Sequence, residues 1–144
     1  MIVVDTSVWV DLFIPKNKVR SDLAEKVFEV IEKKGIEIYA PKLFVVEFIG
    51  MMKMLAGKVP TNVFEKINLL DESVIFETAK DVALKVHPRA ADAYFIATAK
   101  LTNSILITND KVMAKNAKKA GIEAYYLIEE FDKALERIKK LQQL

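Results

Sequence analysis

Four acidic residues lie in four separate segments of the sequence, each where an α/β fold can direct it toward a common site. They are Asp5 in MIVVDTS, Glu47 in FVVEFI, Asp92 in RAADAYFIATA and Asp110 in ILITND. Carboxylates gathered from distant segments repel one another, by about 4 kcal/mol for each pair at ~4 Å in an effective dielectric constant of about 20. A divalent cation offsets this repulsion, so the four residues predict a metal-dependent site.

The residue types limit which metal and which chemistry such a site can use. The sequence has no cysteine and a single histidine, His87, which excludes thiolate zinc sites, thiol catalysis and two-histidine metal motifs. Ligands that are all oxygen favour Mg²⁺ or Mn²⁺, which activate water and neutralise charge at a phosphate. Metal-assisted hydrolysis of a phosphodiester is therefore the expected reaction. Four polar residues flank the acids and are expected to orient ligands or waters: Thr6, Ser7, Thr108 and Asn109.

Hydrophobic patterning predicts strands that alternate with helices. Short apolar or alternating runs predict strands at residues 2–4, 36–40, 104–108 and 122–127. Helices are expected from Thr6 or Ser7 to Phe13, from Ser21 or Asp22 to Gly35, from Pro41 to about Ala56, over 60–86, over 90–101, over 111–120 and from Glu129 onward. The 60–86 segment can divide into two helices near 71–73, and an edge strand over 67–70 is an alternative. Strands separated by such helices imply a parallel sheet covered on both faces, in one domain spanning 1–144.

This arrangement places the acids near one edge of the sheet, where parallel α/β folds bind ligands. Asp5 ends the first strand and Asp110 follows the strand at 104–108, so both are expected at the carboxyl edge. Glu47 lies about two turns into its helix, and its apolar neighbours leave it no polar face. Asp92 lies at the start of a helix, where the dipole favours a carboxylate. A carboxylate buried in such surroundings must be paired, protonated or metal-bound.

Charge and hydropathy bound the cellular setting. The net charge is +2, from 22 basic and 20 acidic residues, which neither demands nor forbids a nucleic-acid partner. Asp5 interrupts the apolar N-terminus, so no secretory signal is expected. The most apolar stretch, 43–55, contains Glu47 and Lys53 and is too short to span a bilayer. A cytoplasmic protein without a membrane partner is therefore expected.

The four acidic segments, in this order, resemble the motifs of the PIN domain family, and most closely those of the VapC group of toxin ribonucleases. The resembling segments are VVDTS with Asp5, VVEF with Glu47, ADAYFIATA with Asp92 and LITND with Asp110. The resemblance implies a three-layer α/β/α sandwich with a central, mainly parallel sheet of about five strands. It implies an Mg²⁺- or Mn²⁺-dependent ribonuclease in which these four residues are catalytic and bind the metal. It also implies a homodimer and a small antitoxin as partners.

Two further features carry hypotheses about partners. Arg89 and Lys111 lie beside acidic motifs and are candidate RNA contacts, although a solvated loop explains Arg89 at least as well and a solvated helix face explains Lys111 better. The helix over 43–55 is apolar around most of its circumference, which favours an interface to which Trp9 and Phe13 add. A non-catalytic PIN-like module that binds RNA or scaffolds a protein is the alternative function.

Overall fold

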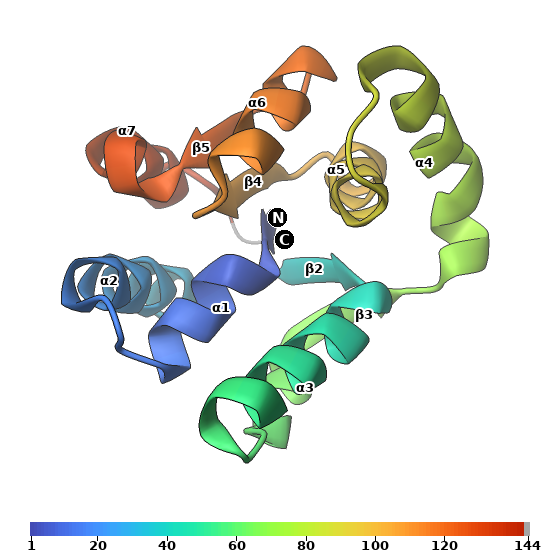
Figure 1. The fold of residues 1–144 in the computed structure, drawn as a ribbon. Helices are drawn as coiled ribbons and strands as arrows, with labels where there is room; N and C mark the ends of the chain where they lie inside the picture. The colour runs from blue at the N-terminus through green and yellow to red at the C-terminus, as the bar shows by residue number, and fades with distance from the viewer. Residues whose placement is uncertain (143–144) are drawn as a thin grey trace.

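The central feature of the structure, a computed structural model that describes residues 1–142, is a five-stranded parallel sheet (Figure 1). Its strands are β1 (Ile2–Val4), β2 (Ile38–Pro41), β3 (Ile67–Leu70), β4 (Ile105–Thr108) and β5 (Ala124–Tyr126). They lie in the order β3-β2-β1-β4-β5, and each neighbouring pair is parallel. The strand order reverses direction between β1 and β4, which creates the crevice where ligands bind in open α/β sheets.

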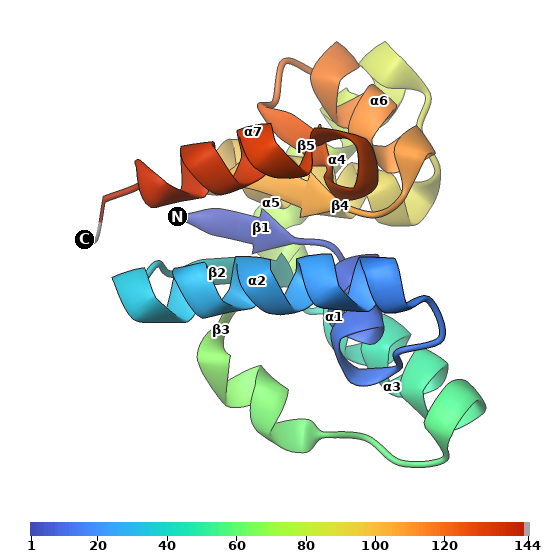
Figure 2. The ribbon, with the colours of Figure 1, turned by 90° about the vertical axis from the view of Figure 1, so that its left-hand side faces the viewer.

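Helices cover both faces of the sheet. They are α1 (Thr6–Phe13), α2 (Lys18–Lys34), α3 (Leu43–Ala56), α4 (Glu72–Val86), α5 (Ala90–Thr102), α6 (Lys111–Lys119) and α7 (Leu127–Lys139), with a 3₁₀ turn, η1 (Thr61–Lys66). In Figure 2, α2 and α7 lie side by side in front of the strands. Figure 1 shows α5 on the opposite face of the sheet, with α4 packed against it. The predicted parallel α/β sandwich is confirmed.

The core explains why the central strands hold the site firmly. β1 and β4 are buried along their whole length, as expected for strands covered on both faces. Aromatic side chains fill the space between α1, α2 and α3, where the rings of Phe44 and Phe48 stack with centroids 5.4 Å apart. Trp9 packs there against Phe28. Trp9 is only 3% exposed, so the prediction that it contributes to a surface patch is wrong.

Several predicted element boundaries also differ from the structure, for example the strands β2 and β5, which begin at Ile38 and Ala124 instead of 36 and 122. Helix α2 begins at Lys18, before Ser21 or Asp22, because the Asn17 side chain caps it by accepting from the backbone N–H of Arg20. Pro41 ends β2 instead of opening α3, and its position pairs with Leu70 of β3. Leu127 begins α7 two residues before the expected start at Glu129.

The segment 60–86 contains the largest departure from the predicted helices. Residues 67–70 form the edge strand β3, the alternative to the helical prediction. Residues 67–70 pair in register with residues 38–41 of β2. The paired residues are 29 positions apart in the sequence, as for Ile38 and Ile67. Tertiary hydrogen bonding thus overrides the local pattern. Within residues 1–142, no helix combines the length and the apolar composition that crossing a bilayer requires.

Candidate metal and active site

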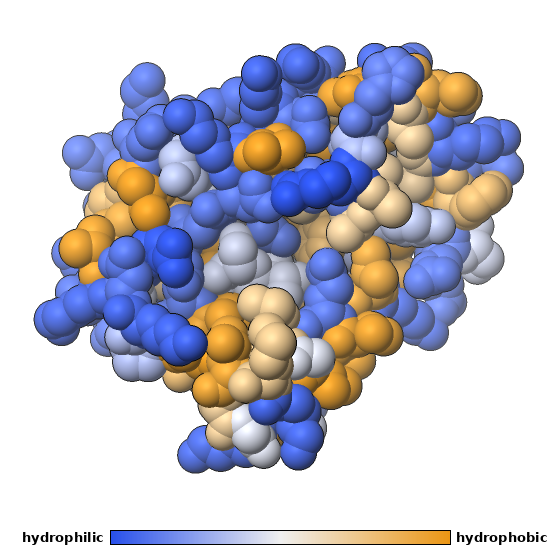
Figure 3. Space-filling view, in the orientation of Figure 1, coloured by the Kyte–Doolittle hydropathy of each residue, from blue (hydrophilic) through white to orange (hydrophobic). Residues whose placement is uncertain are grey.

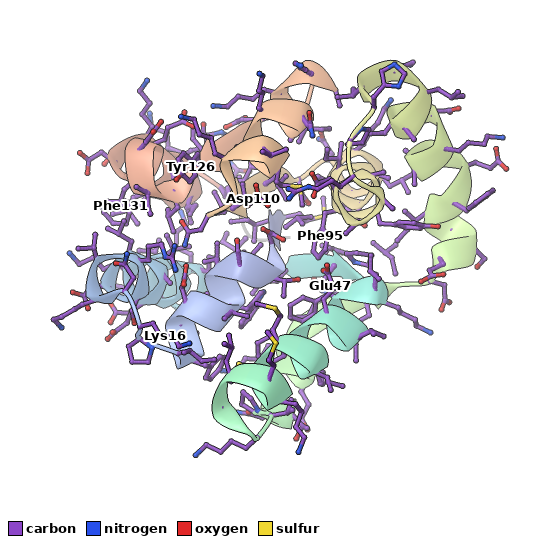
Figure 4. The ribbon with its side chains drawn as sticks, viewed as in Figure 1. Lys16, Glu47, Phe95, Asp110, Tyr126 and Phe131 are labelled. Carbon is purple, nitrogen blue, oxygen red and sulfur yellow. The ribbon has the colours of Figure 1, made fainter. Side chains whose placement is uncertain are left out.

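The four acidic residues line one cleft of about 520 Å³ at the carboxyl edge of the sheet. Asp5 follows β1, Glu47 lies on α3, Asp92 lies in the first turn of α5 and Asp110 precedes α6. Figure 4 shows Glu47 and Asp110 on opposite sides of this central region. The fold therefore brings together side chains that are up to a hundred residues apart in the sequence.

Asp5 and Asp92 are the two buried acids of the cleft, with 6% and 3% of their surface exposed. The Oδ2 atom of Asp5 accepts hydrogen bonds from the hydroxyls of Ser7 and Thr108, each at 2.7 Å. Burial raises the pKa of Asp5 above its usual value, although both hydroxyls act in the opposite direction. The two hydroxyls thus fix the position of the Asp5 carboxylate, but they are neutral and do not compensate its negative charge.

Glu47 is half-buried, as its apolar neighbours predict. The Thr6 hydroxyl donates to Glu47 Oε1 at 2.9 Å, which links the start of α1 to the middle of α3. Burial raises the pKa of Glu47, and the negative charges of Asp5 and Asp92 raise it further against the effect of Thr6. The side-chain donors to Glu47 and Asp5 are thus neutral hydroxyls, and a cation beside the two carboxylates would stabilise their charged forms.

Arg89 joins the other two acids. Its Nη2 atom lies 2.5 Å from Asp110 Oδ2 and 3.1 Å from Asp92 Oδ2, and its Nε donates to Asp92 at 3.1 Å. Burial raises the pKa of Asp92, with Arg89 opposing it. At Asp110, burial also acts to raise the pKa, but Arg89 and the backbone amides at the start of α6 outweigh it and lower the value. The candidate RNA contact Arg89 thus neutralises part of the acidic cleft itself.

Asp110 also caps the helix that follows it. Its Oδ1 accepts from the backbone N–H groups of Val112 at 2.9 Å and Met113 at 3.2 Å. Its own backbone N–H donates to the Thr108 hydroxyl at 2.9 Å. Thr108 is completely buried, so its single hydroxyl holds both Asp5 and Asp110 in place. Capping and participation in the cleft are compatible because they use different oxygens of Asp110.

The donor set of the cleft suits a hard divalent cation, because it consists of carboxylate and hydroxyl oxygens. As the side chains stand, however, no three acidic residues among 1–142 converge closely enough to bind a metal ion. The contacts above give the reason: hydroxyls hold Asp5 and Glu47, and Arg89 holds Asp92 and Asp110. Cation binding by all four acids would require Arg89 to leave Asp92 and Asp110.

Two predicted residues lie differently from the others. The backbone N–H of Asn109 bonds to Ser7, but the Asn109 side chain is directed to Asp11, a buried acid on α1 that the sequence reading missed. The signal for Asp11 is its position in the apolar run VWVDLF, one turn after Ser7. Lys111 does not line the cleft and instead approaches Glu129 at 3.8 Å.

The fold and the site thus define a class of protein: parallel α/β sandwiches with an acidic cleft at the carboxyl edge of the central strands, here β1 and β4. The sequence model of the PIN domain family matches residues 2–119. The chain belongs to the PIN domain family.

Among solved structures, the chain is similar to one described as a toxin-antitoxin complex from Klebsiella pneumoniae. The two share 21% sequence identity and a TM-score of 0.62, and the similarity covers 79% of this chain and 91% of that one. At this identity the likeness bears on the fold alone. A comparison with curated protein sequences finds no match.

Proposed function

We propose that this protein is a metal-dependent endoribonuclease that hydrolyses RNA phosphodiester bonds and is the toxin of a toxin–antitoxin pair. The observation that carries the proposal is the convergence of Asp5, Glu47, Asp92 and Asp110 on one cleft of a PIN domain. PIN domains are generally nucleases. Within residues 1–142 no histidine or cysteine lines the cleft, and the hydroxyls of Thr6 and Ser7 donate to Glu47 and Asp5, which favours attack by water.

The four acids are the residues that would hold Mg²⁺ or Mn²⁺. A bound cation supplies charge neutralisation at the phosphate and lowers the pKa of attacking water. The chain itself fixes where this chemistry takes place. Ser7 and Thr108 both donate to Oδ2 of Asp5, and these two bonds set the orientation of its carboxylate.

Arg89 has two successive roles in this proposal. In the metal-free protein its guanidinium neutralises Asp92 and Asp110. Its side chain is 55% exposed, so it can swing away when a divalent cation replaces it. A released guanidinium beside the cleft is suited to bind a phosphate of the RNA in a bidentate manner.

A surface patch on α3 supports a protein partner. Four of its hydrophobic side chains are exposed, Met54 at 73%, Val46 at 70%, and Ile49 and Met51 at 38% each. In Figure 3, hydrophobic residues gather over α3 at the lower part of the view. Phe13, also 38% exposed, packs against Phe48 beneath this patch. We assign the patch to contact with a second copy of the chain or with a small antitoxin.

Cleavage assays test the catalytic proposal directly. Purified protein is incubated with structured and single-stranded RNA in Mg²⁺, Mn²⁺ or EDTA, beside Asp5→Asn and Asp92→Asn. Metal-dependent cutting that both variants lose is the expected result. Cutting that survives both substitutions would identify a contaminating nuclease. Absence of cutting together with absence of metal binding by calorimetry would favour the non-catalytic PIN-like module.

The interface has a matched control on another helix. Met54→Glu places a charge in the α3 patch, whereas Leu84→Glu changes a side chain of similar exposure, 69%, on α4. Light scattering is expected to give a dimer for the wild type and Leu84→Glu, and a monomer for Met54→Glu. A wild-type monomer at high concentration would remove homodimerisation from the proposal and leave the antitoxin.

Induced expression in bacteria tests the toxin role. The wild type is expected to arrest growth, and Asp5→Asn is not.

A further inference from the structure

Asp11 is a buried carboxylate that the proposed mechanism does not use. It lies on α1, one helical turn after Ser7, and is 7% exposed. Its immediate neighbours in the chain, Val10 and Leu12, are apolar. An acid in such a position must find partners inside the protein, because desolvation of an unpaired charge is costly.

Asp11 forms its shortest hydrogen bond with Asn109, which is 98 residues away in the sequence. The side-chain amide of Asn109 donates to Asp11 Oδ2 at 2.6 Å. Arg20 Nε lies 3.4 Å from the same oxygen as an ion pair, but it lacks the geometry of a hydrogen bond. The Arg20 side chain is also 39% exposed, and solvent screens such a pair. The well-directed hydrogen bond that Asp11 accepts is thus the one from the Asn109 amide.

Asp11 decides which way the Asn109 amide faces. Among the described residues, Asn109 Oδ1 is buried and has no hydrogen-bond partner. A flipped amide would place this oxygen against the Asp11 carboxylate, which is repulsive. The hydrogen bond from the Asn109 amide to Asp11 therefore fixes the amide orientation, although it leaves the amide oxygen without a partner.

Asn109 in turn acts on the metal site through Ser7. The backbone N–H of Asn109 donates to Ser7 Oγ at 3.0 Å, and Ser7 Oγ donates to Asp5 Oδ2 at 2.7 Å. A hydroxyl has one proton to donate. When Asn109 occupies an acceptor position of Ser7, that proton is directed to Asp5. A continuous chain of hydrogen bonds and backbone thus runs from Asp11 to Asp5, a buried acid of the cleft.

We infer that Asp11 is a positioning residue for the candidate metal site. By holding Asn109 it fixes the Ser7 hydroxyl, and the Ser7 hydroxyl fixes the Asp5 carboxylate in the orientation that receives the cation. The last step rests on the proposed function, whereas the effect on Asn109 and Ser7 does not. Stability alone gives little reason for an acid here, because apolar residues of similar volume often replace buried charged networks without loss.

Two substitutions at position 11 separate the acceptor from its charge. Asp11→Asn keeps an oxygen that can accept from Asn109, whereas Asp11→Leu removes the acceptor at similar volume. Titration calorimetry of the purified full chain with Mn²⁺ is expected to show affinity close to wild type for Asp11→Asn. For Asp11→Leu we expect a loss of roughly tenfold or more, in the range known for residues that orient metal ligands. In RNA cleavage, kcat is expected to fall for Asp11→Leu while KM stays unchanged.

A control variant removes general destabilisation as an explanation. Ile138→Ala truncates a fully buried side chain on α7, which packs on α2 away from the cleft. Its Mn²⁺ affinity is expected to match wild type although its melting temperature falls. Equal losses of affinity in Asp11→Leu and Ile138→Ala would overturn the inference, as would wild-type affinity in Asp11→Leu.

Hydrogen exchange of the metal-free protein provides a readout that is independent of the proposed function. The backbone amide of Asn109 is expected to exchange faster in Asp11→Leu than in wild type, and to remain protected in Asp11→Asn. If wild type neither binds Mn²⁺ nor cuts RNA, the proposed function fails, and this exchange still decides the inference. Unchanged protection of Asn109 in Asp11→Leu would overturn it.

Discussion

The two sides of the acidic cleft are held by different kinds of contact. On the inner side, Asp5 and Glu47 accept hydrogen bonds from neutral hydroxyls. On the outer side, Asp92 and Asp110 bind the guanidinium of Arg89, which is 55% exposed. The hydroxyls on the inner side fix the positions of two carboxylates without neutralising them. On the outer side the guanidinium neutralises two carboxylates and is itself partly exposed to solvent. Under the proposed function, the inner side would be preorganised for a divalent cation, and on the outer side that cation would replace the guanidinium of Arg89.

The largest expected effect comes from breaking the inner side at Thr108. Thr108→Val keeps the shape but removes the hydroxyl that bonds to both Asp5 and the backbone of Asp110. Metal affinity and RNA cleavage are each expected to fall roughly 10- to 100-fold. The matched control is Thr98→Val, since Thr98 is equally buried and its hydroxyl bonds only within α5, to the carbonyl of Tyr94. Equal losses in the two variants would mean that Thr108 serves packing rather than the site.

Removal of Arg89 tests the outer side and is expected to act in the opposite direction. In Arg89→Ala the competing cation is absent, so the Mn²⁺ affinity measured by calorimetry should rise by up to about tenfold, because an exposed ion pair contributes at most about 1 kcal/mol per partner. Arg137→Ala is the control, since Arg137 makes one ion pair with Glu123 on the surface far from the cleft. Weaker Mn²⁺ binding in Arg89→Ala would show that Arg89 supports the site instead of guarding it.

Charge removal should change the stability of the metal-free protein with opposite sign on the two sides. Asp5→Asn relieves an uncompensated buried charge and is expected to increase the free energy of unfolding, by about 1 kcal/mol. Asp110→Asn loses the pairing with Arg89 and is expected to decrease it by a few tenths to about 1 kcal/mol. Urea denaturation in EDTA measures both. Changes of the same sign would contradict the division of the cleft into two sides.

The smallest expected effect is on the pH dependence of stability without metal. Burial raises the pKa of Asp5, Glu47 and Asp92, so the folded protein binds protons more readily than the unfolded chain. Their contribution to stability is therefore lost as the pH rises through the folded pKa values. The lowered pKa of Asp110 acts in the opposite sense, giving stability that is lost only as the pH falls through its folded value.

We therefore expect the free energy of unfolding in EDTA to fall as the pH rises above about 4, where carboxylates of the unfolded chain titrate. The fall should be smaller in Asp5→Asn. Mn²⁺ affinity should rise over the same interval, because cation binding needs deprotonated carboxylates. A stability that rises toward pH 7 in EDTA would mean that Asp5, Glu47 and Asp92 are compensated by a positive charge not identified above.

Much of the fold was predictable because its central strands carry strong local signals. The runs at 2–4 and 105–107 are continuously apolar, as expected for strands covered on both faces, and both lie in central strands of the sheet. β3 was the exception. The sequence of 67–70 carries little strand signal, and its conformation depends on pairing with β2.

The sequence by itself determined which acids can meet, because Asp5 and Asp110 follow strands whose carboxyl ends share one edge. It also limited the class of cation that such a site could bind, since no thiolate and only one imidazole is available. Only the tertiary structure decided what each acid contacts. The donors to Asp5 and Asp11 include Thr108 and Asn109, which are 103 and 98 residues away along the chain, and local patterning carries no information about such pairs. Arg89, three residues before Asp92, was visible as a neighbour, but its bond to Asp110 exists because the sheet places α5 and α6 side by side.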